Sequence, residues 1–365
     1  MNYIVDRTRQ TPAYLQLYDR LKADIVKQIY PYGSKLPSRR VMAAETGVSA
    51  ITVEHTYALL CEEGYLEPRE RSGFFVTFRA SDGFAASPAP LSPHPLYHDV
   101  SHGALPGFPF SVLTRTMRRV ISDYGEAILE KPPNAGCQEL REAICRYLAR
   151  NRGIEADETQ IVIGSGAEYL YRLIVGLLGR TRVFALESPS YEKIEQIYRS
   201  AGAACELLPL GADGIQSSAL AVTRASVLHI SPYRSYPTGV TASASKRHEY
   251  IRWAEQGDRF LVEDDFESEF SVSSKPEETL FTLSQQRRVI YLNTFTKTIY
   301  PSLRVGYMVL PKDLVERFSK ELGFCSCTVP TFEQFLLAEL IASGDFERHI
   351  NRVRRAKRRQ LSNEL

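Results

Sequence analysis

Hydrophobic residues near the start of the chain recur at the spacing of successive helical turns and then give way to two short apolar runs. Pro12 opens the first helical stripe, and Ser38 and Ser49 stand where the N-caps of two further helices are expected. Gly47 and Gly64 mark the ends of these two helices. The pattern predicts helices over residues 11–29, 39–47 and 50–64, followed by a hairpin with strands at 65–67 and 73–76.

Three helices followed by a small hairpin form the layout of a winged helix-turn-helix, which binds duplex DNA. Side chains opposite the apolar stripe of the third helix have the size to approach base edges, and nearby arginines can hold phosphates. A small helical domain with solvated arginines is the alternative, and the complete layout disfavours it. The residues predicted to contact DNA are Arg39, Arg40, Ser49, Thr52, His55, Thr56, Arg71, Ser72 and Gly73.

Beyond the hairpin the pattern changes twice. Residues 79–98 are rich in Ala, Ser and Pro and predict an extended linker between a DNA-binding domain at 1–78 and a larger domain at 99–365. In the larger domain helical patterns alternate with short apolar runs, which favours an α/β fold with a mostly parallel, buried sheet. The expected helices cover 138–150, 168–178, 190–200 and 246–256, and the expected strands cover 160–163, 182–186, 226–230, 260–262, 289–292 and 305–310.

Composition narrows the class of protein. The formal net charge is only +2 over 365 residues, so a DNA-binding surface has to be local. No stretch reaches the roughly 18 apolar residues of a membrane span, and the N-terminus lacks a signal-peptide core. The six cysteines are scattered and complete no zinc site. We expect a cytoplasmic protein without a metal ion.

Residues that are candidates for catalysis or ligand binding stand at the ends of the predicted strands, where ligands bind in α/β sheets. They are a Gly-Ser-Gly turn before a helix, Tyr191, three consecutive acids at 263–265, and Lys297. Each has a plain structural alternative: a tight turn, a capping cluster or a surface lysine. Together they match the needs of pyridoxal 5′-phosphate (PLP), which requires an amine, a carboxylate for its ring nitrogen, phosphate donors and a stacking ring.

Several longer motifs carry a resemblance to a known family. The stretch "GSKLPSRRVMAAETGVSAITVEHTYALLCEEGYLEPRERSGFFV" resembles a GntR-type winged helix, while "EDDFESEF" and "TFTKTIYPSLRVGYMVLP" resemble a fold-type-I aminotransferase domain. In this order they are similar to the MocR/GabR family of transcriptional regulators. The resemblance implies a PLP-dependent regulator that binds a double-stranded DNA operator as a head-to-tail homodimer and responds to an amino acid, an amine or the PLP level. An active aminotransferase with a DNA-binding appendage and a regulator without cofactor remain the alternatives.

The resemblance also implies roles for individual residues. Lys297 would be the Schiff-base lysine, Asp264 would face the pyridine nitrogen, Arg304 would bind the phosphate, and Tyr191 would stack on the ring. Lys193 is a candidate anchor for a carboxylate of the effector. The other expected cofactor contacts are Ser165, Gly166, Ala167, Thr294 and Thr296.

Three features depart from the family pattern. Phe266 stands where tyrosine is usual, so a phenol contact to the cofactor would be missing, and Ala50 replaces a common arginine of the recognition helix. The sequence ends at Leu365, before the small C-terminal domain of relatives, so we expect that domain to be absent.

Overall fold

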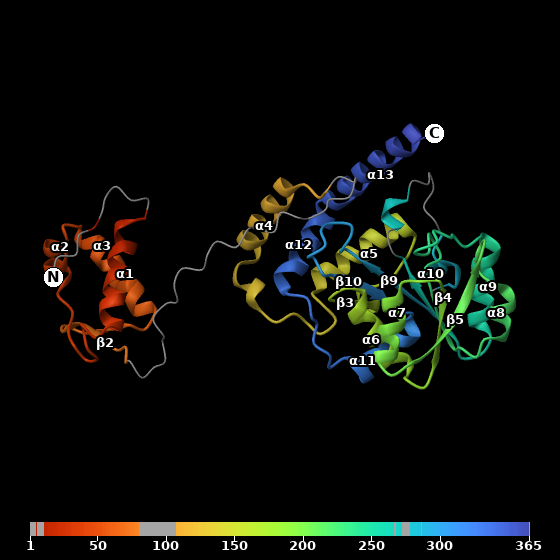
Figure 1. The fold of residues 1–365 in the computed structure, drawn as a ribbon, viewed down its shortest axis with the longest axis horizontal. Helices are drawn as coiled ribbons and strands as arrows, with labels where there is room; N and C mark the ends of the chain where they lie inside the picture. Colours follow the sequence, from red (N-terminus) through yellow and green to blue (C-terminus); the bar gives the residue numbers. More distant parts are fainter. Residues whose placement is uncertain are drawn as a thin grey trace. The chain divides into compact units, whose positions relative to one another are not determined.

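The computed structural model describes residue 5 and residues 11–79, 107–265, 268–271, 278–285 and 287–364. The predicted linker beyond residue 79 and Phe266 therefore lie outside the described residues. The chain divides into two compact units, Met1–Val100 and Ser101–Leu365 (Figure 1). Within the described residues, no helix is both long and apolar enough to cross a membrane.

The first unit contains three helices and a two-stranded antiparallel sheet. As predicted, the Ser38 and Ser49 hydroxyls cap two helices by accepting from backbone N–H groups, and Gly47 ends one of them with a φ of 67°. The first helix is shorter than predicted and leaves Ile29 43% exposed beyond its end. The elements are α1 Ala13–Val26, α2 Arg39–Thr46, α3 Ala50–Glu62, β1 Leu66–Arg69 and β2 Gly73–Val76.

The second unit is built on an eight-stranded sheet in the order β3-β10-β9-β8-β7-β4-β5-β6. Its central strands from β9 to β5 pair in parallel, as predicted, whereas β10 is antiparallel to both neighbours. Strands β5 and β6 were not predicted. The strands are β3 Ile161–Gly164, β4 Val183–Ser188, β5 Ala204–Gly211, β6 Gly214–Ile215, β7 Val227–Ile230, β8 Phe260–Asp264, β9 Val289–Thr294 and β10 Gly306–Val309.

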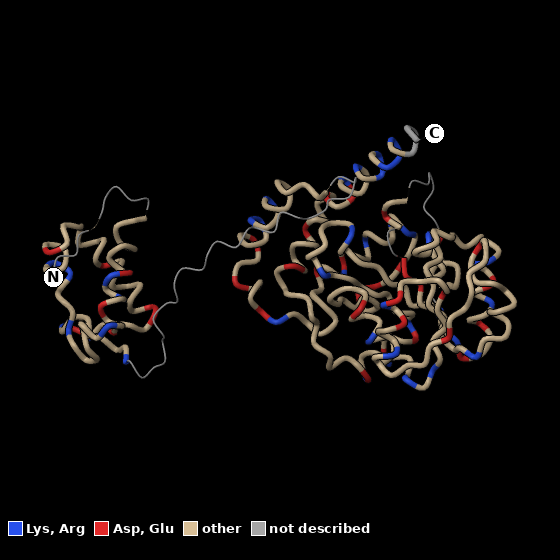
Figure 2. The backbone as a smooth tube through the Cα atoms, viewed as in Figure 1, with Lys and Arg blue, Asp and Glu red and all other residues tan. Residues whose placement is uncertain are grey.

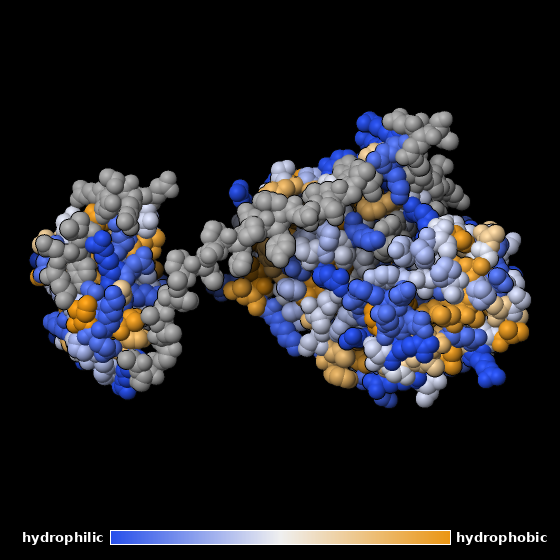
Figure 3. Space-filling view, in the orientation of Figure 1, coloured by the Kyte–Doolittle hydropathy of each residue, from blue (hydrophilic) through white to orange (hydrophobic). Residues whose placement is uncertain are grey.

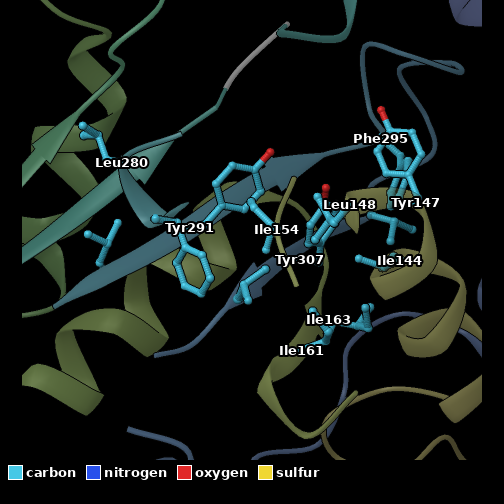
Figure 4. Close-up of a cluster of buried hydrophobic side chains, with 14 of the residues drawn as sticks. Ile144, Tyr147, Leu148, Ile154, Ile161, Ile163, Leu280, Tyr291, Phe295 and Tyr307 are labelled. Atoms are coloured by element: carbon cyan, nitrogen blue, oxygen red, sulfur yellow. The ribbon is translucent and has the colours of Figure 1, made fainter. Parts of the chain in front are cut away.

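Helices cover both faces of this sheet (Figure 1). One face packs on α6, α7 and α11, and the other on α5, α9, α12 and α13. Figure 4 shows part of the core on the face covered by α5, α9, α12 and α13 (the second core), which includes Tyr147 of α5 and the strand residues Tyr291 and Tyr307. The helices are α4 Phe110–Tyr124, α5 Gln138–Arg152, α6 Ala167–Leu178, α7 Glu192–Ser200, α8 Ser217–Val222, α9 Ala244–Glu255, α10 Leu280–Leu283, α11 Lys312–Leu322, α12 Thr331–Ala342 and α13 Asp345–Glu364, with short 3-10 turns at Gly125–Leu129, Glu158–Gln160 and Ser268–Phe270.

The second core also contains buried charges. Arg152 forms an ion pair with Asp265 at 2.6 Å, and both side chains are almost fully buried. Glu269 is 5% exposed; its Oε1 accepts from the Asn293 amide, whereas its Oε2 is buried without a hydrogen-bond partner. Burial, with a further contribution from the charge of Asp265, raises the pKa of Glu269 to about 7. The folded protein therefore favours the protonated form of this acid.

This raised pKa predicts how stability depends on pH. Between the ordinary value of 4.5 and about 7, Glu269 holds its proton in the folded state and releases it in the unfolded state. Its contribution to stability is complete at low pH and is lost as pH rises through 7. We expect Glu269→Gln, which mimics the protonated form, to exceed wild type in free energy of unfolding at pH 8 by about 3 kcal/mol.

Urea denaturation at pH 5 and pH 8 measures this difference. The advantage of Glu269→Gln should shrink at pH 5, and Glu192→Gln, at an exposed position of α7, should show no such trend. An equal effect of Glu269→Gln at both pH values would contradict the assignment.

Candidate functional site

A cavity of about 320 Å³ lies in the second unit where β4, β7, β8 and β9 end. The volume is within the range of small-molecule sites, and the edge of the sheet is the one where ligands bind in α/β folds. The turn before α6 closes the cavity on one side. Among the residues predicted for the site, those that line the cavity are Gly166, Ala167, Tyr191, Asp264, Thr294, Thr296, Lys297 and Arg304.

Asp264 forms the polar floor of the cavity. It is 6% exposed, and its carboxylate accepts a hydrogen bond from the Tyr171 hydroxyl of α6. Nε2 of His229 lies 3.5 Å from Oδ2 of Asp264, while the opposite ring nitrogen of His229 contacts the Tyr198 hydroxyl at 2.7 Å. Nε2 itself is buried without a hydrogen-bond partner. Asp264 is thus held in place by Tyr171, with His229 beside it, and still faces the cavity.

One end of the cavity is suited to an anion. Gly166 adopts a φ of 86° as the N-cap of α6, so the helix begins at Ala167 with N–H groups that have no intrahelical partner. Arg304 lies beside this turn, and its Nη2 is 3.4 Å from Oε2 of Glu168. Glu168 lines the cavity and was not predicted, although an acid in the first turn of a helix is a common dipole partner. An incoming phosphate would compete with this carboxylate for Arg304.

Two of the predicted phosphate contacts are already engaged. The backbone N–H of Ser165 donates to the Thr328 hydroxyl at 3.0 Å, and Ser165 does not line the cavity. In this structure the Ser165 N–H therefore faces Thr328 and not the cavity, while Gly166 and Ala167 of the predicted turn line it. The Thr296 hydroxyl donates to the carbonyl of Leu303 at 3.1 Å, which holds together the ends of the segment that carries Lys297.

Lys297 follows β9 and lines the cavity together with Asp264 and Arg304. The sequence predicted an amine shielded from water by uncharged neighbours. The structure instead has an exposed Lys297 between the buried residues Phe295 and Thr298. The backbone is thus anchored on both sides, while the side chain lies at the open edge of the cavity.

The rim of the cavity is aromatic. Tyr191 is 45% exposed at the start of α7, and its ring contacts that of Tyr236 edge to face at 6.1 Å. Lys193, the predicted effector anchor, does not line the cavity. Its Nζ lies 3.9 Å from Oε1 of Glu168 and 6.0 Å from the centre of the Tyr191 ring. Lys193 therefore belongs to the surface beside the mouth.

Glu187, at the end of β4, is a cavity residue that sequence reasoning missed. It is 5% exposed and accepts from the Ser235 hydroxyl at 2.6 Å and from the Ser231 N–H at 3.2 Å. Burial raises the pKa of Glu187 to about 7. The sequence signal that could have identified Glu187 is its position at a strand end, between Leu186 and the turn that carries Tyr191.

Gly306 determines how closely the two halves of the cavity approach. It lies on β10 opposite Gly164 of β3 on one side and opposite Thr294 of β9 on the other. A Cβ at this position would lie 3.1 Å from Cγ2 of Thr294 and 3.3 Å from the carbonyl carbon of Gly166. The absence of a side chain at Gly306 therefore lets the turn before α6 lie next to the end of β9, which leads into the segment that carries Lys297.

In the first unit, the candidate nucleic-acid interface centres on α3. Thr52 is half-buried, and its hydroxyl and N–H both contact the Ser49 hydroxyl. His55 is exposed and stacks on the Tyr14 ring at 4.2 Å. Thr56 is fully buried and donates to the carbonyls of Tyr14 and Thr52, each at 3.0 Å. The prediction that Thr56 lies on the exposed face is wrong, because that side of the helix packs on α1.

Basic residues of this unit, drawn blue in Figure 2, occur at the start of α2 and in the turn between β1 and β2. Arg39 and Arg40 are both exposed at the start of α2, and Arg39 forms an ion pair with Glu54. The turn between β1 and β2 carries Arg71, Ser72 and Gly73, all exposed. Lys35, which was not predicted, packs its side chain against Gly73, where a Cβ would lie 3.1 Å from Cε of the lysine. Lys35 therefore adds a positive charge to the wing.

The two units match two protein families. Residues 13–76 match the family described as bacterial regulatory proteins, gntR family, and residues 99–365 match aminotransferase class I and II. The uncharacterized HTH-type transcriptional regulator YdeL of Bacillus subtilis is 30% identical over 98% of this chain, which spans 79% of that regulator. The probable rhizopine catabolism regulatory protein MocR of Rhizobium meliloti is 29% identical over 96% of this chain and 76% of its own length.

The fold is also that of solved aminotransferases. Pyrococcus horikoshii kynurenine aminotransferase is similar with a TM-score of 0.60 and 26% identity, over 69% of this chain and 66% of that enzyme. The chain therefore belongs to the MocR-type transcriptional regulators of the gntR family, in which a winged helix is joined to an aminotransferase class I and II domain.

Proposed function

We propose that this regulator holds PLP in the cavity of its second unit and binds a double-stranded DNA operator through its winged helix. The observation that carries the proposal is the meeting of Lys297, Asp264 and Arg304 around one cavity. A small amine or amino acid that reaches the cavity would be the effector, and the PLP level itself is a further possible signal. Because its partner is DNA, we assign the protein to the cytoplasm. We also expect a head-to-tail homodimer, as the family resemblance implies.

The residues present fit the cofactor. The buried Nε2 of His229 lacks a hydrogen-bond partner beside Asp264, so a polar ring could complete this arrangement. The start of α6 and Arg304 offer N–H donors for a phosphate at the other end. When bound, PLP would supply an electrophilic aldehyde conjugated to an electron-withdrawing ring.

Each residue then has a definable task. Lys297 would provide the amine that retains the cofactor, and its exposed position allows an incoming amine to compete with it. Asp264 would keep a proton on the ring nitrogen, because a buried carboxylate stabilises a nearby cation. Tyr191 would cover the ring from the rim. Regulation requires that the effector bind two arrangements of the protein with different affinities.

The chemistry of the cavity favours an effector with an amine. Glu168 and Glu187 line the cavity in addition to Asp264, and Tyr191 and Tyr236 form an aromatic rim. Carboxylates and aromatic faces both attract ammonium groups. Lys193, paired with Glu168 beside the mouth, would hold an effector carboxylate where one is present.

An active aminotransferase remains the second candidate, because the solved relative with the same fold is an aminotransferase. Incubation of the PLP-loaded protein with common amino acids and a keto acid separates the two proposals. Multiple turnovers would establish the enzyme, whereas a regulator changes its operator affinity without sustained turnover.

The role of Lys297 can be tested by spectroscopy. In Lys297→Ala, we expect loss of the visible absorbance of the lysine-bound cofactor, because the amine that forms the covalent link is removed. Lys320→Ala, at an exposed position of α11, should retain the spectrum. A wild-type spectrum in Lys297→Ala would exclude this lysine as the attachment point.

Asp264→Asn tests the ring partner. Asparagine keeps the size of the side chain but loses the negative charge, so PLP should still bind and then be lost faster on dialysis. Asp265, the alternative ring partner, does not line the cavity and is paired with Arg152, which favours Asp264. Retention equal to that of wild type would contradict the assignment of Asp264.

Arg40→Ala tests the DNA-binding face. Removal of one phosphate contact should weaken binding to every DNA sequence and reduce the slope of log affinity against log salt by about 0.9. Arg224→Ala, at an exposed position of the second unit, serves as the control. Unchanged affinity and slope in Arg40→Ala would show that the start of α2 lies away from the backbone of the DNA.

A further inference from the structure

The exposed face of α3 differs from the face expected from sequence. The exposed residues of this helix recur three or four positions apart and therefore form one stripe on its surface. Thr56 is buried and Thr52 is half-buried, so neither residue belongs to this exposed stripe. The exposed members are Ala50, Ile51, Glu54, His55, Ala58 and Glu62.

Ile51 is the unusual member of the stripe. It is 78% exposed, compared with 48% for Val41 and 43% for Ile29, the other exposed aliphatic side chains in the described part of this unit. A single exposed apolar side chain is common on protein surfaces and needs no function by itself. The position of Ile51 distinguishes it, because it lies in the first turn of the second helix of the helix-turn-helix. In this motif the first turns of that helix contact base edges.

Its polar neighbours are partly engaged within the protein. Glu54 pairs with Arg39, His55 stacks on Tyr14, and the hydroxyls of Ser49 and Thr52 contact each other at 2.8 Å. Ile51 thus presents the largest accessible apolar surface of this turn. Figure 3 shows hydrophobic residues interspersed with hydrophilic ones on the visible face of this unit.

The surroundings of the stripe suit duplex DNA. Arg40, Lys35 and Arg71 are exposed on the same unit and can contact phosphates. Ala50 and Ala58 add little bulk to the stripe, so the helix can approach the floor of a groove closely. In the major groove the one apolar group that distinguishes bases is the C5 methyl of thymine.

We propose that Ile51 determines operator specificity by contacting the C5 methyl group of a thymine in the major groove. This inference rests on the proposed binding of an operator by the winged helix. It assigns part of the sequence preference to an apolar contact, whereas the arginines and Lys35 contribute affinity without sequence preference.

The test uses full-length protein and DNA duplexes that it selects from a random-sequence pool. Each thymine of a selected duplex is replaced in turn by deoxyuridine, which removes only the C5 methyl group. For wild type we expect one or two replacements per half-site to weaken binding about three- to tenfold, as burial of one methyl group predicts. In Ile51→Ala the same replacements should have no further effect, because the two changes remove the same contact.

Two variants serve as controls. Ile51→Val keeps a branched apolar side chain and should retain most of the sensitivity to deoxyuridine. Val41→Ala removes exposed apolar surface from α2 and should leave that sensitivity unchanged. Binding of unrelated DNA, with its salt dependence, should be the same in wild type and Ile51→Ala.

The outcomes separate the inference from the proposed function. If wild type and Ile51→Ala bind DNA and show equal sensitivity to deoxyuridine at every position, Ile51 does not read a thymine methyl group, although the operator-binding function stands. If wild type binds no DNA at low salt, the proposed function fails, and the inference fails with it.

Discussion

The pleat of β8 separates three consecutive acids, and the arrangement of the second unit depends on this separation. Successive side chains of a strand point to opposite faces of the sheet. Asp264 therefore meets Tyr171 and the cavity on one face, while Asp265 meets Arg152 of α5 on the other. Glu263 shares the second face and accepts from backbone N–H groups at the start of α10. The end of β8 and the residue after it thus supply one carboxyl group that faces the cavity and two that are used within the fold.

In the first unit, too, one element has a buried structural face and an exposed face. The side of α3 that packs on α1 uses Val53 and Tyr57, and the hydroxyl of Thr56 is satisfied by the carbonyl of Tyr14. Packing on α1 therefore fixes the position of helix α3. Its exposed stripe does not need contacts within the protein to stay in place. Such a rigid support is what precise recognition of a groove requires. In both units, the elements that present functional side chains are fixed by a fully buried opposite face.

Much of this could be predicted from the sequence because the signals are local. Ser38 and Ser49 bond to N–H groups within their own helices, and Lys297 follows an apolar strand directly. Features that depend on packing between distant segments could not be predicted. The burial of Thr56 results from α1, and the Ser165 N–H is used by Thr328, more than a hundred residues away. Strand β5 was missed because Pro209 and exposed positions interrupt its apolar run.

Gly306 has a consequence for how such a regulator could diverge. Gly306 pairs with both Gly164 and Thr294. The turn before α6 and the end of β9 therefore approach its backbone closely, because Gly306 has no side chain. An added methyl group would lie 3.1 Å from Cγ2 of Thr294 and 3.3 Å from the carbonyl carbon of Gly166, so these neighbours would have to shift by a few tenths of an ångström. If the cavity holds PLP as proposed, one substitution at Gly306 would weaken that binding without any change to Lys297, Asp264 or Arg304, and the winged helix would remain unchanged.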